Sequence, residues 1–163
     1  MATPEMLAKH RVWLSQSIDY PYLFKGYMQA VGFTSQAEGE PDAPYEDSLF
    51  EGSGDFDSNW DVWSEIQDHI SDEDLQTIMD DLAAFHESAT GLVEEDVHSW
   101  PSCWDRAGND FHFTRNGHGC GFWDGDWEEH GQALTDLSKP FSTLEMVGVR
   151  DDDGDLHSVY FHC

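Results

Sequence analysis

The feature that most constrains this chain is a stretch of eighty residues, 26 to 105, that has no Lys or Arg but contains twenty-one Asp and Glu. A folded surface with many anions and no internal cations repels itself. We therefore expect it to meet a cationic partner, to face high salt, or to take the place of another polyanion. The whole chain has a formal net charge of −27. Direct contact with nucleic acid or an anionic membrane is not expected, because both depend on Lys and Arg.

Composition predicts one folded domain over residues 1–163. Hydrophobic residues make up 39% and aromatic residues 13% of the chain, which is too rich for a disordered acidic tail. The three cysteines, Cys103, Cys120 and Cys163, follow no disulfide or zinc spacing, which is typical of a reducing cytoplasm. No apolar run approaches the roughly 20 residues of a membrane span, and the N-terminus has no export signal.

Apolar residues at helical spacing predict three helices in the first part of the chain. The first covers residues 20–33 and is followed by a Gly-, Pro- and acid-rich loop over 34–54. The second starts at Ser58 as N-cap, with an inward face of Trp60, Trp63, Ile66 and Ile70. The third starts at Ser71, ends near Gly91 and buries Leu75, Ile78, Met79, Leu82 and Phe85.

From residue 109 the pattern changes from a helical to an alternating period, which predicts strands. DFHFTR over 110–115 alternates Phe with polar residues, Asn116-Gly117 is a turn signal, and GCGFW returns the chain as a first hairpin. A short helix is expected over 128–137. LEMVGVR and HSVYFH then flank the Asp- and Gly-rich turn 151–155 as a second hairpin.

The predicted fold class is therefore α+β. Residues 1–92 form a mainly helical part, and residues 109–163 form a hairpin–helix–hairpin part. The acidic helices are expected to pack on one face of an antiparallel sheet built from the two hairpins.

The glycine-rich string around His118 is a candidate small-ligand pocket or a tight structural turn. As a pocket it would use Arg115 to fork two hydrogen bonds to a carboxylate, His118 to titrate near neutral pH, and neighbouring polar and aromatic groups. Asp124 is alternatively an internal partner of Arg115. The candidate pocket residues are Arg115, Asn116, His118, Trp123 and Asp124.

No motif predicts catalytic residues, a metal or a cofactor. His112, His118 and Cys120 lie close in sequence but match no zinc spacing, and in a strand His112 would face solvent or a covering helix. Asp151, Asp153 and Asp155 alternate without the Gly and Glu positions of a calcium loop. Nucleophile elbows, phosphate-binding loops and HExxH are absent from the sequence.

The string DFHFTRNGHGCGFWDGDW, residues 110–127, resembles a segment of small phage-encoded proteins of unassigned function that read DFxxTRNGHGxGFWDG. The helix containing MDDLAAFHES is also similar to those proteins, so the resemblance covers about residues 71–150. His112 and Cys120 depart from the pattern, which has a large apolar and a small residue there. The resemblance implies a viral origin and a host-cell cytoplasm, and it implies no reaction.

Acids three or four residues apart on a helix stand about 5–6 Å from one another, so the acidic helices predict a row of negative charge. Such a row can occupy the groove that a protein offers to DNA phosphates. The leading hypothesis is a mimic of DNA or RNA that inhibits a basic, nucleic-acid-binding host defence protein, a restriction or CRISPR complex, without turnover. The alternatives are a small-ligand or metal-dependent enzyme at His118, a salt-adapted protein, and a virion or scaffold component. The candidate acidic face is Asp55, Asp57, Asp61, Glu65, Asp68, Asp72, Glu73, Asp80 and Asp81.

Overall fold

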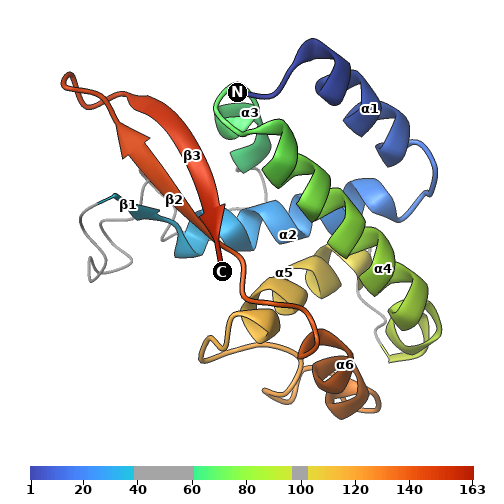
Figure 1. Cartoon of the computed structure of the whole chain (residues 1–163). Helices are drawn as coiled ribbons and strands as arrows, with labels where there is room; N and C mark the ends of the chain where they lie inside the picture. Colours follow the sequence, from blue (N-terminus) through green and yellow to red (C-terminus); the bar gives the residue numbers. More distant parts are fainter. Residues whose placement is uncertain (39–60, 97–102) are drawn as a thin grey trace.

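The computed structural model describes residues 1–38, 61–96 and 103–163, which form a mixed helix and sheet fold (Figure 1). The helices form one body, with the strands along one side of it (Figure 1). In chain order the elements are α1 (Pro4–Leu14), α2 (Tyr20–Thr34), β1 (Gln36–Ala37), α3 (Val62–Ile66), α4 (Asp72–Asp96), α5 (Cys103–Arg115), α6 (Gly131–Ser138), β2 (Glu145–Arg150) and β3 (Leu156–His162).

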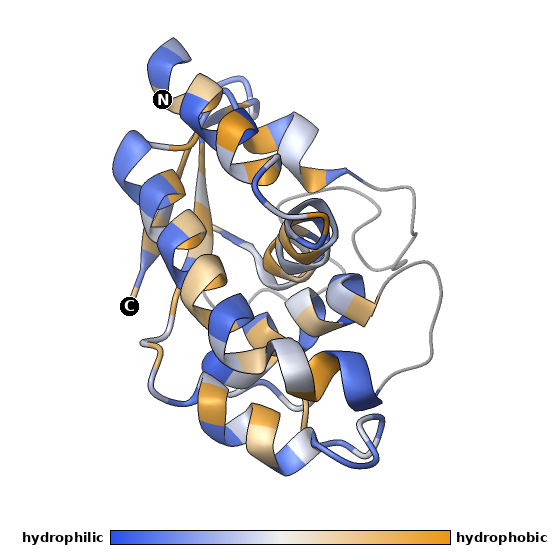
Figure 2. Ribbon diagram, turned by 90° about the vertical axis from the view of Figure 1, so that its right-hand side faces the viewer, coloured by the Kyte–Doolittle hydropathy of each residue, from blue (hydrophilic) through white to orange (hydrophobic). Residues whose placement is uncertain are grey.

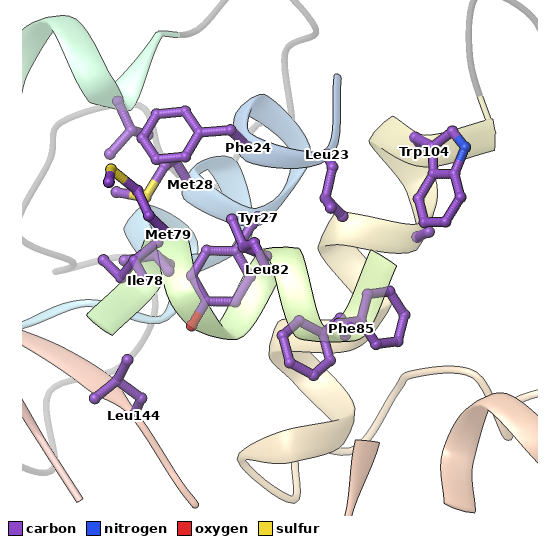
Figure 3. Close-up of a cluster of buried hydrophobic side chains, with 14 of the residues drawn as sticks. Leu23, Phe24, Tyr27, Met28, Ile78, Met79, Leu82, Phe85, Trp104 and Leu144 are labelled. Carbon is purple, nitrogen blue, oxygen red and sulfur yellow. The ribbon is translucent and has the colours of Figure 1, made fainter. Parts of the chain in front are cut away.

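Helix α4 confirms the third predicted helix and its buried face. Ser71 Oγ accepts a hydrogen bond of 3.1 Å from the backbone N–H of Asp74, as the capping signal predicts. All five residues predicted to be buried are buried, and Figure 3 shows several of them facing side chains of α2. The helix continues past Gly91 to Asp96, because Val93 extends the buried face and Gly91 lies in open space.

Helices α2 and α5 cross with their backbones close together, because each has a glycine at the crossing. A Cβ on Gly26 would overlap the carbonyl oxygen of Asp105, and a Cβ on Gly108 would overlap that of Leu23. Asn109 Nδ2 also donates a hydrogen bond of 2.7 Å to the Gly26 carbonyl oxygen. The predicted helix over 20–33 is confirmed as α2, and this crossing fixes α5 against it.

The first predicted hairpin is wrong, because residues 110–115 belong to helix α5. The alternation of Phe111 and Phe113 suggested a strand, but Trp104, Ala107, Phe111 and Arg115 follow helical spacing and are all buried. Asn116-Gly117 ends this helix instead of making a hairpin turn. Gly117 has φ +69°, His118 N–H bonds to Phe113 O, and Gly117 N–H bonds to Thr114 O. These are the two hydrogen bonds of a Schellman C-cap.

The sheet has three strands in the order β1-β2-β3. The second predicted hairpin is confirmed, since β2 and β3 are antiparallel and joined by a turn with Gly154 at φ +86°. On its other edge β2 pairs in parallel with β1. Strand β1 lies within the segment that was predicted to be a loop, residues 34–54. Residues 109–163 therefore contain one hairpin, and the sheet is only partly antiparallel.

The shorter predicted helices are displaced from their expected starts. Helix α3 begins at Val62, with Asp61 as N-cap, whereas Ser58 and Trp60 lie outside the described residues. Helix α6 confirms the helix expected over 128–137, but it begins at Gly131. In the part of the chain that the structure describes, no helix is long and apolar enough to cross a membrane.

Candidate functional site

Arg115, the first candidate pocket residue, is enclosed at the end of α5, with 1% of its side chain exposed. Its Nη2 lies 2.7 Å from Asp81 Oδ2 on α4. Its Nε and Nη2 both donate to Ser142 O, and its Nη1 donates to the Tyr27 hydroxyl at 3.2 Å. The guanidinium also lies 5.2 Å from the centre of the Phe111 ring. Its internal partner is therefore Asp81 and not Asp124, and its donors are directed to the protein itself.

Asn116 holds the segment that leads into β2. Its Oδ1 accepts a hydrogen bond of 2.7 Å from the Leu144 N–H, and its Nδ2 donates to Leu144 O at 3.3 Å. The same Nδ2 lies 2.9 Å from His112 O and 3.2 Å from His112 Nδ1. We call this pairing of the Asn116 amide with the Leu144 backbone the Asn116–Leu144 clamp. The Asn116 amide therefore holds backbone groups of the chain in place.

His112 lies in the interior on the buried side of helix α5, and not on the predicted strand, where it would face solvent or a covering helix. It is fully buried, and its Nε2 lies 2.8 Å from Thr34 Oγ1 on α2. Burial lowers the pKa of His112 well below its usual value, and positive charge at His118 and Arg115 lowers it further. The buried ring is therefore neutral at pH 7.

His118 lies next to His112 with its ring centre 5.8 Å away. Its Nε2 is 2.6 Å from Glu145 Oε1 at the start of β2, and 19% of its side chain is exposed. This buried Nε2 makes no hydrogen bond within the described chain, so its contact with Glu145 is an ion pair only when His118 is protonated. The His118 side chain therefore lies half-buried beside an acid.

Trp123 and Asp124 lie in the loop between α5 and α6. The carboxylate of Asp124 accepts hydrogen bonds from the backbone N–H of Gly121 and of Asp126, so it shapes its own loop. Trp123 is 52% exposed. In the described part of the chain no hydrogen bond or ion pair links either residue to Arg115.

Asp110, a buried acid beside this loop, is not among the candidate residues of the sequence analysis. Asp110 on α5 accepts a hydrogen bond of 2.6 Å from Trp127 Nε1. Burial raises the pKa of Asp110 to about 6, although the Trp127 hydrogen bond opposes the rise. The sequence predicts this buried position only if residues 104–115 are assigned to a helix, because Asp110 then lies on its inner face.

The geometry offers little for covalent or metal chemistry. Burial raises the pKa of the Cys103 and Cys120 thiols, which leaves little reactive thiolate at neutral pH. Over residues 1–38, 61–96 and 103–163, no group of three or more His, Cys, Asp or Glu side chains is arranged to hold a metal ion. The hollow beside β1 and β2, lined by Ala37, Glu38, Val149 and Arg150, contains none of the candidate residues.

The candidate acidic face is divided by the structure. Asp55 and Asp57 lie outside the described residues. Asp72 accepts hydrogen bonds from Thr3, and Asp81 forms an ion pair with Arg115. Both carboxylates are therefore already bound to groups of the chain itself. Five candidates are exposed. They are Asp61, the N-cap of α3, Glu65 within α3, Asp68 in the link to α4, and Glu73 and Asp80 on α4.

Helix α4 presents a longer row of acids than the candidate acidic face contains. Glu73, Asp80, Glu87 and Glu94 are all exposed and follow one another at intervals of seven residues. Residues seven apart on a helix differ by only about 20° in direction, so the four acids share one face. We call these four residues the α4 acid row. The seven-residue spacing of these acids is visible in the sequence. The candidate acidic face, however, ends at Asp81 and does not include Glu87 and Glu94.

The α4 acid row is about 32 Å long at 1.5 Å per residue, with successive acids about 10.5 Å apart. Hydrophobic and hydrophilic residues alternate along the helices, and the helix bearing the row packs its apolar side against the core (Figures 2 and 3). A single lysine approaches this part of α4 in the described contacts, Lys9, whose Nζ lies 2.5 Å from Gln76 Oε1. The row is therefore held rigidly and is not neutralised by ion pairs within the described chain.

Comparisons with protein-family models, with curated proteins and with solved structures give no significant match to this chain.

Proposed function

We propose that this chain is a DNA mimic that binds a basic nucleic-acid-binding protein and blocks it by stoichiometric binding. The observation that carries the proposal is the α4 acid row, four exposed acids on one face of a helix that is anchored through the hydrophobic core. A rigid anionic face can be matched by the Lys and Arg residues that a protein normally directs to phosphates. The chain itself acts as a ligand and performs no reaction.

The spacing of the row supports this proposal. DNA rises about 3.4 Å per base step along each strand, so the 10.5 Å between successive acids corresponds to roughly three base steps. The whole row spans the axial length of about nine base steps. Asp61, Glu65 and Asp68 add exposed charge near the N-terminal end of α4.

The kind of partner follows from the charge and from the resemblance of residues 71–150 to phage-encoded proteins. A phage protein with an anionic face would act in the cytoplasm of the infected cell. The host proteins that threaten phage DNA and hold nucleic acid in cationic channels include restriction and CRISPR complexes. We therefore propose a host defence protein of this type as the target.

The proposal is favoured over a ligand site around His118 because of how that region is built. Arg115 donates hydrogen bonds to Asp81 and to Ser142 O. The Asn116 side chain accepts a hydrogen bond from the Leu144 N–H. A ligand that needed the guanidinium or the amide would have to displace these internal contacts.

The first test is affinity capture from a bacterial host lysate at low salt, followed by elution with duplex DNA. We expect DNA to release nucleic-acid-binding proteins, since the same cationic groups cannot hold both polyanions. Released candidates are then purified and tested for inhibition at stoichiometric ratios.

Two variants that each remove four negative charges make the test specific. The row variant should lose the captured protein, whereas the control variant, whose exposed acids lie in the β2–β3 turn and before α6, should retain it. Equal capture by the two variants would exclude the α4 acid row as the binding surface. The row variant is Glu73→Gln, Asp80→Asn, Glu87→Gln and Glu94→Gln, and the control variant is Glu128→Gln, Asp152→Asn, Asp153→Asn and Asp155→Asn.

A further inference from the structure

The buried contacts of His112 couple the protonation state of one ring to the attachment of β2. The Asn116 side chain joins His112 on one side to the Leu144 backbone on the other. Leu144 immediately precedes β2, which begins at Glu145. The charge state of His112 can therefore act on the segment that leads into the sheet.

The hydrogen bonds around His112 select one neutral form of the ring. Asn116 Oδ1 accepts from the Leu144 N–H, so the Nδ2 group, a donor, faces His112 Nδ1. A proton on His112 Nδ1 would point at this donor, so Nδ1 carries no proton. The proton lies on Nε2, which donates to Thr34 Oγ1, while the Thr34 hydroxyl donates to Ala30 O or Val31 O.

Protonation of His112 is incompatible with this arrangement. The imidazolium carries a proton on both ring nitrogens, so Nδ1 would become a donor facing the donor Nδ2 of Asn116. Reversing the Asn116 amide would satisfy Nδ1, but it would direct the NH₂ group at the Leu144 N–H and the oxygen at His112 O. Either way, at least one pair of like groups meets in a buried site.

The groups around His112 give no compensating negative charge in direct contact. From α2 it faces the Tyr27 ring and Thr34, and from α5 it lies near Arg115 and Asn116. From the segment after α5 it faces His118, whose own contact is with the acid Glu145 on β2. A proton on His112 would thus face two other positively charged or chargeable groups.

We propose that protonation of His112 opens the Asn116–Leu144 clamp, which makes the entry to β2 an acid-sensitive joint between the helical body and the sheet. The rest of the hairpin keeps its attachment through the buried Met146 and Val159 and through the bond from Val159 N–H to His69 O. The opening is therefore local. It is independent of the α4 acid row and of the proposed function.

The direction of the pH dependence follows from linkage. In the open form His112 is freed from burial and returns toward the ordinary pKa of about 6.5, whereas burial depresses its pKa in the closed form. The open form therefore binds more protons, and the closed form loses stability as the pH falls below about 6.5. Between that value and the pKa of the closed form, the opening equilibrium rises by about tenfold per pH unit.

The test is hydrogen exchange of the Leu144 amide measured by NMR, with rates corrected for the intrinsic pH dependence of exchange. Protection at Leu144 should fall by about fivefold between pH 6.5 and pH 5.5. At both pH values Leu144 should be much less protected than the buried amide of Leu82 on α4, because the Leu144 opening is local whereas Leu82 exchanges only when the core opens. The ¹⁵N shifts of the His112 ring in the same samples should show a proton on Nε2 alone at neutral pH. Equal protection at Leu144 and Leu82, or no loss at Leu144 in acid, would overturn the proposal.

Two variants separate His112 from other titrating groups. His112→Gln removes the charge change, so the Leu144 amide should lose its acid response. His157→Gln changes an exposed histidine on β3 and should leave the response intact. If His112→Gln does not fold, the ring shifts and the two amides of the unaltered chain still decide the question. A ring protonated on Nδ1 at neutral pH would contradict the arrangement on which the clamp depends.

Discussion

Arg115 Nη2 lies 2.7 Å from Asp81 Oδ2, and this ion pair joins the C-terminal end of α5 to the middle of α4. The arginine side chain is almost fully buried, and 25% of the Asp81 side chain is exposed. Arg115 also holds Ser142 O in the segment before β2. One side chain thus connects two helices and the approach to the sheet.

Replacing Arg115 with Met should reduce the free energy of unfolding by about 3–5 kcal/mol, because it leaves Asp81 and Ser142 O without their donor. Arg115→Lys should cost less, about 1–3 kcal/mol, since it keeps the charge but not the forked geometry. Denaturant unfolding of both variants measures these losses. Lys139→Met, which removes an exposed ion pair, should change stability by no more than about 1 kcal/mol. Equal effects at Arg115 and Lys139 would contradict the described role of Arg115.

Gly26→Ala and Gly108→Ala should each destabilise the fold, because the added methyl group would overlap backbone atoms at the α2–α5 crossing. We expect losses of about 1–3 kcal/mol or more, as for overpacking elsewhere in protein cores. Thermal unfolding measures the change. The matched control is Gly91→Ala on α4, where nothing lies within 4 Å of the added Cβ. That control should be stabilising by roughly 0.5–1 kcal/mol, since alanine favours helix.

Asp110→Asn should stabilise the protein at pH 7 and lose that effect in acid. The pKa of Asp110 is raised to about 6 in the folded state, above its unfolded value of 3.8. The folded state therefore binds more protons between these values, so stability falls as the pH rises from about 3.8 to about 6, and the full cost of the ionised carboxylate is present above pH 6. Asn removes this cost but keeps an oxygen that can accept the Trp127 hydrogen bond.

We expect a gain of about 1–3 kcal/mol at pH 7 that has disappeared near pH 4, measured by urea unfolding at both pH values. His112 contributes with the opposite sign, because its depressed pKa makes the folded state less stable as the pH falls. The comparison is therefore made between variant and parent at each pH. A gain that is the same at pH 4 and pH 7 would show that Asp110 does not titrate as described.

The fold should persist at low ionic strength despite the net charge of −27. At about 0.01 M salt the Debye length is roughly 30 Å, so repulsion extends across the whole domain. The hydrophobic core that connects α2, α4 and α5 should nevertheless keep the chain folded, with a lower melting temperature than at 1 M salt. Circular dichroism across this range measures it. Unfolding at low salt, reversed only near molar salt, would favour salt adaptation as the reason for the charge.

The parts of the fold that were predictable from sequence are those with one unambiguous local signal. Helix α4 has a capping serine, a long apolar face and acids in its first turn, and these agree with one another. The β2–β3 hairpin has alternating residues on both sides of an Asp- and Gly-rich turn. In both cases the local preference and the final packing coincide.

Helix α5 was missed because two periods are superimposed in its sequence. Phe111 and Phe113 alternate as in a strand, and Asn116-Gly117 suits a hairpin turn as well as a helix end. The helical period depends in part on Gly108, a small residue whose importance comes from the close approach of α2. Strand β1 is only two residues long and depends on its partner β2, so its own sequence gives little indication of it.

The candidate site was predicted less well than the fold, because its outcome depends on long-range partners. Asp81 looked like another surface acid, but it faces Arg115 across 34 residues of sequence. Asn116 looked like a pocket residue, but it binds the Leu144 backbone 28 residues away. The α4 acid row, in contrast, depends only on helical geometry, and its seven-residue spacing could have been found from sequence.

The most direct measurement for the proposed function uses the purified partner, duplex DNA and this chain in one titration. The account predicts that DNA and this chain exclude each other, with stoichiometric inhibition of DNA binding. The row variant should bind at least about tenfold more weakly, since four lost charge contacts of roughly 0.5 kcal/mol each sum to ~2 kcal/mol. A ternary complex of partner, DNA and this chain, or unchanged affinity of the row variant, would contradict the account.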